Sequence, residues 1–71
     1  MLLTKAKIGK TFYIKRVEGK EKMIKFLFSL GCCEGEEITL ISILAGNYIV
    51  NIKDSRYAID EGMAKSIVLE D

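Results

Sequence analysis

The only two cysteines of this chain are adjacent, Cys32 and Cys33, and three glutamates, Glu34, Glu36 and Glu37, follow them closely. Thiolates bind soft metal ions and take part in redox exchange, whereas carboxylates bind hard cations. The segment therefore has two interpretations. It is either a metal or redox site in a very small protein, or a sharp turn that carries thiols.

The surroundings of the cysteine pair favour the turn. A chelate normally uses two cysteines separated by two residues together with further ligands, but this chain has no third cysteine and no histidine. Adjacent side chains tend to diverge, and a reducing cytoplasm opposes a disulfide between neighbours. We expect no metal site and no cofactor, and we expect the glutamates to be solvated. A metal-binding or redox role is the alternative.

Composition and charge further limit the classes of protein to which the chain could belong. The chain has 71 residues, 11 of them basic and 10 acidic, for a net charge of +1. We expect a single domain over residues 1–71 and no nucleic-acid partner, because nucleic-acid binders usually carry a basic excess. No apolar run approaches the ~20 residues that span a bilayer, and no signal peptide is evident, which predicts a soluble cytoplasmic protein. No nucleophile–base pair or phosphate-binding glycine loop is visible, so we do not expect an enzyme.

The first half of the chain predicts one strand and one helix. Residues 11–17 are rich in β-branched and aromatic side chains, as in a strand, although the pattern does not say which face is buried. Residues 20–30 have the helical period, with a glycine directly after the last apolar position, where helices often end. The apolar residues that recur with this period are Met23, Ile24, Phe26, Leu27 and Leu30.

The second half predicts short strands separated by tight turns. We expect strands at 37–44, 48–52, 56–59 and 66–69, with turns at Gly46–Asn47 and Asp54–Ser55 and a short helix at 61–65 capped by Asp60. So many short strands favour a small barrel, because closure removes exposed edges. Alternation slips at 40–41, 49–50 and 67–69. Such slips indicate either bulges or apolar side chains that face outward and form a partner patch.

These elements resemble the FeoA family of small ferrous-iron transport proteins over nearly the whole chain. The most distinctive segment of the family is a leucine-glycine-apolar-x-proline-glycine turn, which appears here at residues 30–35 with Cys32 at the apolar position and Glu34 in place of proline. The other matching positions are Leu3, Thr4, Gly9, Ile38, Leu40, Ile59, Ala64, Ile67 and Leu69. Their order and spacing together carry the resemblance.

The resemblance implies a mainly β fold, a small SH3-like β-barrel with an inserted amphipathic helix and one or two short helices in all. It implies a cytoplasmic accessory of bacterial ferrous-iron uptake that binds the FeoB transporter and its G domain, and that meets the membrane only through the transporter. Weak self-association is left open. The alternatives are a metal-sensing or transition-metal-binding domain, as in the related repressors, and a GTPase-activating partner that would use Arg16 or Arg56.

The candidate contacts for the transporter lie in the turn after the helix, on the strands and on the polar face of the helix. The candidate partner-binding residues are Gly31, Cys33, Glu34, Gly35, Glu37, Ile41, Ile43, Tyr48 and Arg56.

Overall fold

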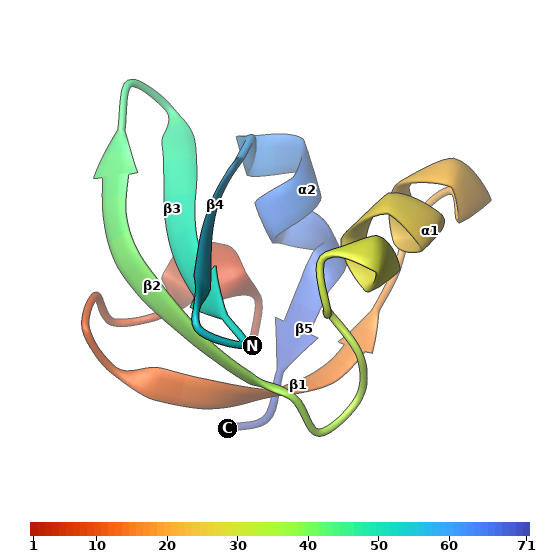
Figure 1. Ribbon diagram of the computed structural model, residues 1–71, viewed down its shortest axis with the longest axis horizontal. Coiled ribbons are helices and arrows are strands. Elements are labelled where there is room, and N and C mark those ends of the chain that lie inside the picture. The colour runs from red at the N-terminus through yellow and green to blue at the C-terminus, as the bar shows by residue number, and fades with distance from the viewer.

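Five strands form one antiparallel sheet in the order β4-β3-β2-β1-β5 in the computed structural model, which describes residues 1–71 (Figure 1). The predicted order of one strand, one helix and then several short strands is confirmed. Along the chain the elements are η1 (Leu3–Lys5), β1 (Thr11–Val17), α1 (Glu21–Ser29), β2 (Glu37–Leu44), β3 (Asn47–Ile52), β4 (Ser55–Ile59), α2 (Glu61–Ser66) and β5 (Ile67–Leu69).

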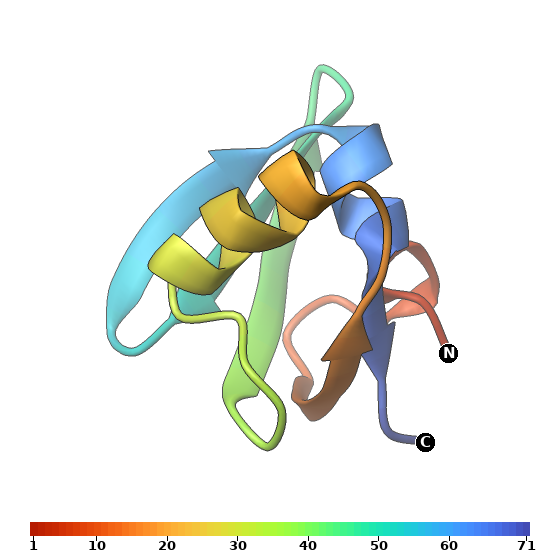
Figure 2. The ribbon, with the colours of Figure 1, turned by 90° about the vertical axis from the view of Figure 1, so that its right-hand side faces the viewer.

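The sheet curls but does not close. β4 and β5 are its two edges, and they do not pair with each other. α1 and α2 pack against each other, and α2 also contacts β3, β5 and the 3-10 turn η1 (Figure 2). The mainly β architecture is thus confirmed, whereas the predicted closure is not, because β5 has only three residues and pairs with β1 alone.

The slips in alternation have three different outcomes. In β2 the register shifts between Leu40 and Ser42, so the predicted bulge lies at Ile41. β3 itself pairs with β4 without any irregularity, and Ile49 and Val50 lie opposite the β2 bulge, which is the only register shift at this position. At the end of the chain all three residues of β5 are buried, and the N-terminal segment covers Val68 through a bridge with Leu2. An irregularity is present here too, because the register between β1 and β5 shifts between Ile14 and Arg16, opposite Leu69 and Val68.

Both predicted hairpin turns lie one residue earlier than expected. Ala45 and Gly46 join β2 to β3 with φ of 50° and 82°, and Lys53 and Asp54 join β3 to β4 with φ of 50° and 65°. Two consecutive residues with positive φ are typical of a type I′ turn, whose twist matches that of the flanking strands. The turn residues that the sequence suggested, Asn47 and Ser55, already belong to the strands.

The core lies between the concave face of the sheet and the helices. Phe12 and Ile14 face inward from β1, while Arg16 is exposed, which settles the ambiguity of that strand. η1 was not expected, and it contributes the fully buried Leu3. The core consists of Leu3, Phe12, Ile14, Leu27, Cys32, Ile38, Leu40, Tyr48, Val50, Ile52, Ile59, Ala64, Ile67 and Leu69. Neither α1 nor α2 has the length and the apolar run that a membrane span requires.

Candidate functional site

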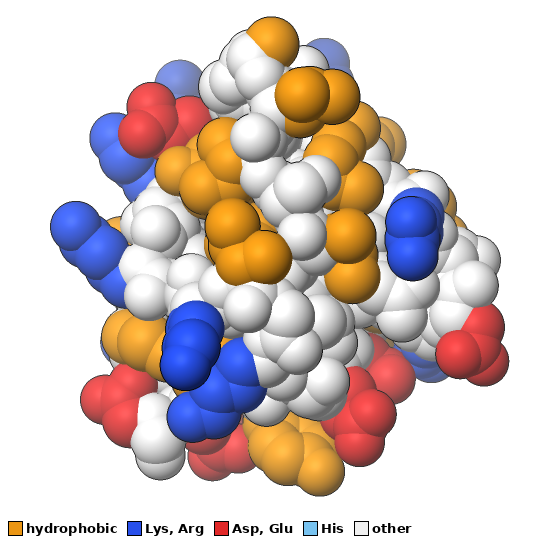
Figure 3. Space-filling model, turned by 90° about the vertical axis from the view of Figure 1, so that its left-hand side faces the viewer, with side chains coloured by type: hydrophobic (Ala, Val, Ile, Leu, Met, Phe, Trp, Pro, Cys, Tyr) orange, Lys and Arg blue, Asp and Glu red, His pale blue; other side chains and the backbone are white.

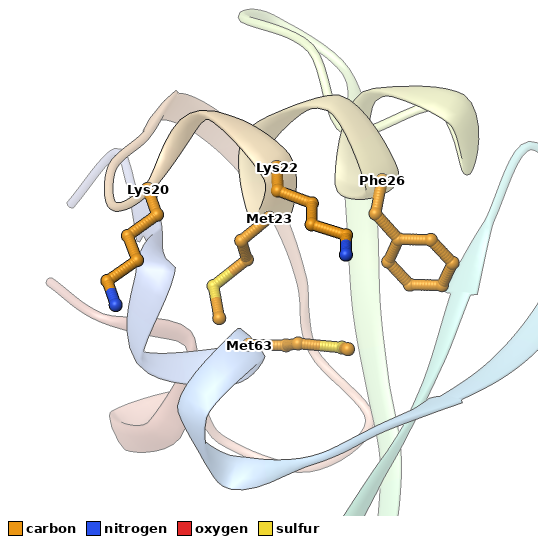
Figure 4. A pocket seen from close by; sticks show the side chains of 5 residues that line it. All are labelled: Lys20, Lys22, Met23, Phe26 and Met63. Atoms are coloured by element: carbon orange, nitrogen blue, oxygen red, sulfur yellow. The ribbon is translucent and has the colours of Figure 1, made fainter.

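An apolar groove of about 400 Å³ lies between α1 and α2. In Figure 4, Met23 extends from α1 toward Met63 of α2, Lys20 lies to one side of Met23, and Lys22 extends between Met23 and Phe26. The residues that line the groove are Lys20, Lys22, Met23, Phe26 and Met63. A concave apolar surface with a few polar groups at its rim is the usual form of a binding site.

The groove exists because only part of the apolar face of α1 packs on the core, and the rest stays exposed. Only Leu27 is fully buried, whereas Phe26 retains 46% of its surface and Phe28 retains 63%. Phe26 lies on the predicted apolar face of the helix, but its ring stays largely outside the core. α2 lies beside the exposed apolar side chains of α1, and its Met63 forms the opposite wall of the groove.

The rim of the groove is positively charged. Lys20 and Lys22 are exposed and take part in no ion pair. Their neighbour Lys25 differs, because its ammonium lies 3.0 Å from the Glu21 carboxylate. The groove therefore combines apolar walls with two cations that have no partner within the chain.

The turn after α1 explains the cysteine pair. Gly31 and Gly35 adopt φ of 105° and 84°, the left-handed region that favours glycine. Cys32 is 2% exposed and belongs to the core, as expected for an apolar position, and burial raises the pKa of its thiol to about 11, with a smaller contribution from the charge of Cys33. Cys33 is half-buried, and its thiol donates to the Gly31 carbonyl at 3.5 Å. Glu34 is exposed.

A polar hollow of about 210 Å³ lies beside this turn. It is lined by Glu36, Glu37, Thr39, Asn51, Lys53 and Asp54. The Lys53 ammonium lies 3.5 Å from the Glu36 carboxylate, so part of the negative charge is balanced within the hollow. Glu37 accepts a hydrogen bond from the Tyr13 hydroxyl at 3.4 Å. No three cysteine, aspartate or glutamate side chains converge as a set that could hold a metal ion.

Hydrophobic side chains gather near the tip of the β2–β3 hairpin (Figure 3). Ile43 is 46% exposed and Leu44 68%, while Ile41 and Ile49 are half-buried. Tyr48 is 8% exposed and belongs to the core, so it is not available as a contact. On β2 both interpretations of the slipped alternation therefore hold, because a bulge and outward apolar side chains occur together.

The expected contact residues come from three parts of the fold. Gly31 to Gly35 belong to the turn after α1, Glu37, Ile41 and Ile43 to β2, and Arg56 to the edge strand β4. The groove residues were missed as a site. Two features of the sequence could have indicated the groove. The apolar stripe of α1 is long for a nine-residue helix, and the next helix contains a methionine.

The fold is shared with several solved structures. Stenotrophomonas maltophilia FeoA, solved with zinc, is 20% identical with a TM-score of 0.87, and the match covers 99% of this chain and 89% of that one. Chlorobium tepidum FeoA is 18% identical with a TM-score of 0.90, over 99% of this chain and 69% of that one. These similarities place the chain among SH3-like FeoA structures.

A longer protein contains the same fold. T. acidophilum IdeR is 20% identical with a TM-score of 0.86, and the match covers 97% of this chain but only 32% of that one. Among curated proteins, none is similar enough to count as a match. The sequence model of the FeoA domain matches residues 1–71, which is the whole chain. The chain therefore belongs to the FeoA family.

Proposed function

We propose that this chain is a cytoplasmic accessory of bacterial ferrous-iron uptake that binds the cytoplasmic part of a FeoB-type transporter, which includes a G domain. Membership of the FeoA family supports the link to iron uptake. The relative from S. maltophilia is itself described as a candidate ferrous-iron transport activating factor. In this proposal the chain reaches the membrane only through the transporter.

The observation that carries the proposal is the open groove between α1 and α2. Small domains bury most of their large apolar side chains, and an apolar hollow rimmed by polar groups marks an interaction site. Here Phe26, Met23 and Met63 line such a hollow, while the hollow beside the cysteine turn has no apolar lining residue. The surface of the chain is therefore better suited to binding a protein than to binding a small polar molecule.

An amide NMR titration tests the proposal. The isotope-labelled chain is titrated with the cytoplasmic part of the ferrous-iron transporter from its own organism. We expect localised shift changes in α1, α2 and the turn at 31–37. A second titration with the transporter part heat-denatured serves as the control for non-specific contacts. Unchanged spectra at high micromolar concentrations of the folded partner would contradict the proposal.

A second role is favoured by the state of Arg56. A GTPase-activating protein supplies a cation, typically arginine, that stabilises charge on the transferred phosphoryl group. Arg16 forms an ion pair with Glu18, whereas Arg56 is exposed on the edge strand β4 and has no ion-pair partner. If the chain accelerates GTP hydrolysis, the Arg56→Ala change should abolish the acceleration and Arg16→Ala should not. An unchanged hydrolysis rate on adding the chain would dismiss this role.

A further inference from the structure

We propose that the groove between α1 and α2 binds an acidic peptide segment, which inserts one bulky apolar side chain between Met23 and Met63 and places its carboxylates beside Lys20 and Lys22. This inference deepens the proposed interaction role and rests on it for the identity of the partner. The chemistry of the bound segment follows from the groove itself.

The walls of the groove are adaptable. Methionine is unbranched and polarizable, so it packs around apolar side chains of different shapes, and it is common at binding surfaces that accept several partners. Met23 and Met63 are both half-buried, and Phe26 closes one end with an exposed ring. We therefore expect leucine, methionine and phenylalanine to be accepted as the inserted side chain, and serine to be rejected.

A side-chain hydrogen bond joins the two helices that form the groove. The Ser66 hydroxyl lies 2.8 Å from the Met23 sulfur and 3.1 Å from the Gly62 carbonyl, which links α1 to α2. Gly19 approaches the same serine so closely that an added Cβ would lie 3.3 Å from its hydroxyl oxygen. The two helices are thus held at a set separation before any partner arrives, which lowers the ordering cost of binding.

The charge of the rim selects an acidic partner. Lys20 and Lys22 have no ion-pair partner in the chain. Lys20 is also the N-cap residue of the nine-residue helix α1, and no side chain caps that end of the helix. The free N–H groups and the helix dipole therefore add positive potential beside the same lysine. Carboxylates on a bound segment would meet both features.

A peptide fits this surface better than a lipid bilayer does. Proteins that bind bilayers through a helix present a protruding apolar face to the lipid. Here Met23 and Met63 lie on opposite sides of a hollow, and Lys20 and Lys22 extend from the start of α1 beside Met23 (Figure 4). A single side chain can enter such a hollow, whereas a flat lipid surface contacts only the rim.

The test uses fluorescently labelled synthetic peptides and the full chain, with binding followed by fluorescence anisotropy. The probe peptide is a short glutamate-rich helix former with one leucine and one methionine on the same face. Two matched peptides replace either the apolar pair with serine or the glutamates with lysine. We expect binding only by the probe peptide, and we expect its affinity to fall as the salt concentration rises.

Variants of the chain locate the site. The double change Lys20→Glu and Lys22→Glu should weaken binding about tenfold, because two exposed ion pairs are lost and repulsion replaces them. The matched control, Lys7→Glu with Lys10→Glu, changes the net charge equally but lies in the loop before β1 and should bind normally. Phe26→Ala should weaken binding as well, and its thermal unfolding should stay close to wild type because the ring is 46% exposed.

Three results would overturn the inference. They are equal binding of the lysine-rich peptide, equal loss of affinity in both double variants, and binding of phosphatidylserine vesicles that competes with the probe peptide.

The experiments also distinguish a failure of this inference from a failure of the proposed function. If the transporter part binds wild type and the Lys20/Lys22 variant equally, the interaction role stands and the groove is not its site. If the peptide binds and the transporter part does not, the groove inference stands and the partner is another acidic protein.

Discussion

Raising the pH should destabilise this protein through the buried thiol of Cys32. Burial, with a smaller contribution from the charge of Cys33, raises the pKa of Cys32 from 9.0 to about 11. The unfolded chain therefore loses this proton at a lower pH than the folded chain. Stability from keeping the thiol neutral is fully present below pH 9.0 and is lost as the pH rises through about 11. A shift of this size corresponds to about 3 kcal/mol.

The measurement is urea unfolding at a series of pH values for wild type and Cys32→Val. The other titratable groups are the same in both proteins, so their effect cancels in the difference. We expect wild type to lose about 3 kcal/mol more of its free energy of unfolding than the variant across this range. Cys33→Ser is the matched control and should retain most of the wild-type dependence. Identical pH dependence in wild type and Cys32→Val would refute the reasoning.

Three further changes test the turns and the cap through the free energy of unfolding in urea. Gly31→Ala should destabilise by about 1–3 kcal/mol, because φ is 105° and the new Cβ would lie 3.1 Å from Ile52 Cγ2; an unchanged midpoint would count against this. Asp54→Gly should stabilise by roughly 0.5–1 kcal/mol, since φ is 65° in a turn that favours glycine at this position; a loss of stability would contradict it. Asp60→Ala should cost about 1 kcal/mol, because the carboxylate accepts a hydrogen bond from the Met63 N–H at 2.8 Å, and Asp60→Asn should recover most of that loss.

The fold was predictable where a segment has a clear period of its own. Residues 11–17 and 20–30 each carry enough apolar side chains in one pattern to specify a strand and a helix, and Asp60 marks the start of the second helix. The hairpin turns were displaced by one residue because Ala45 and Lys53 are unusual at positive φ, so the sequence pointed to the next polar residue instead. η1 has no periodic signal, and Leu3 is buried only because α2 packs over it.

The groove could not be predicted from local patterns. Periodicity places Phe26 on the same stripe as the buried Leu27, and only the packing of α2 against α1 shows that the core ends between them. The same limit applies to Tyr48 and Ile43, which pair across β2 and β3. Tyr48 is buried and Ile43 is not, because Tyr48 lies between β2 and β4, whereas β2 at Ile43 pairs with β3 alone.

The bulge at Ile41 also divides β2 into two parts with different neighbours. Residues of β2 before the bulge pair with β1 as well as with β3, whereas those after it pair with β3 alone. The tip of the hairpin therefore has hydrogen bonds on one side only and little apolar packing beneath Leu44. Such a segment opens locally at a lower free energy than the whole domain, so its amide hydrogens exchange with solvent while the core stays protected. The exposed isoleucine and leucine at the tip thus sit on the most adaptable part of an otherwise rigid sheet.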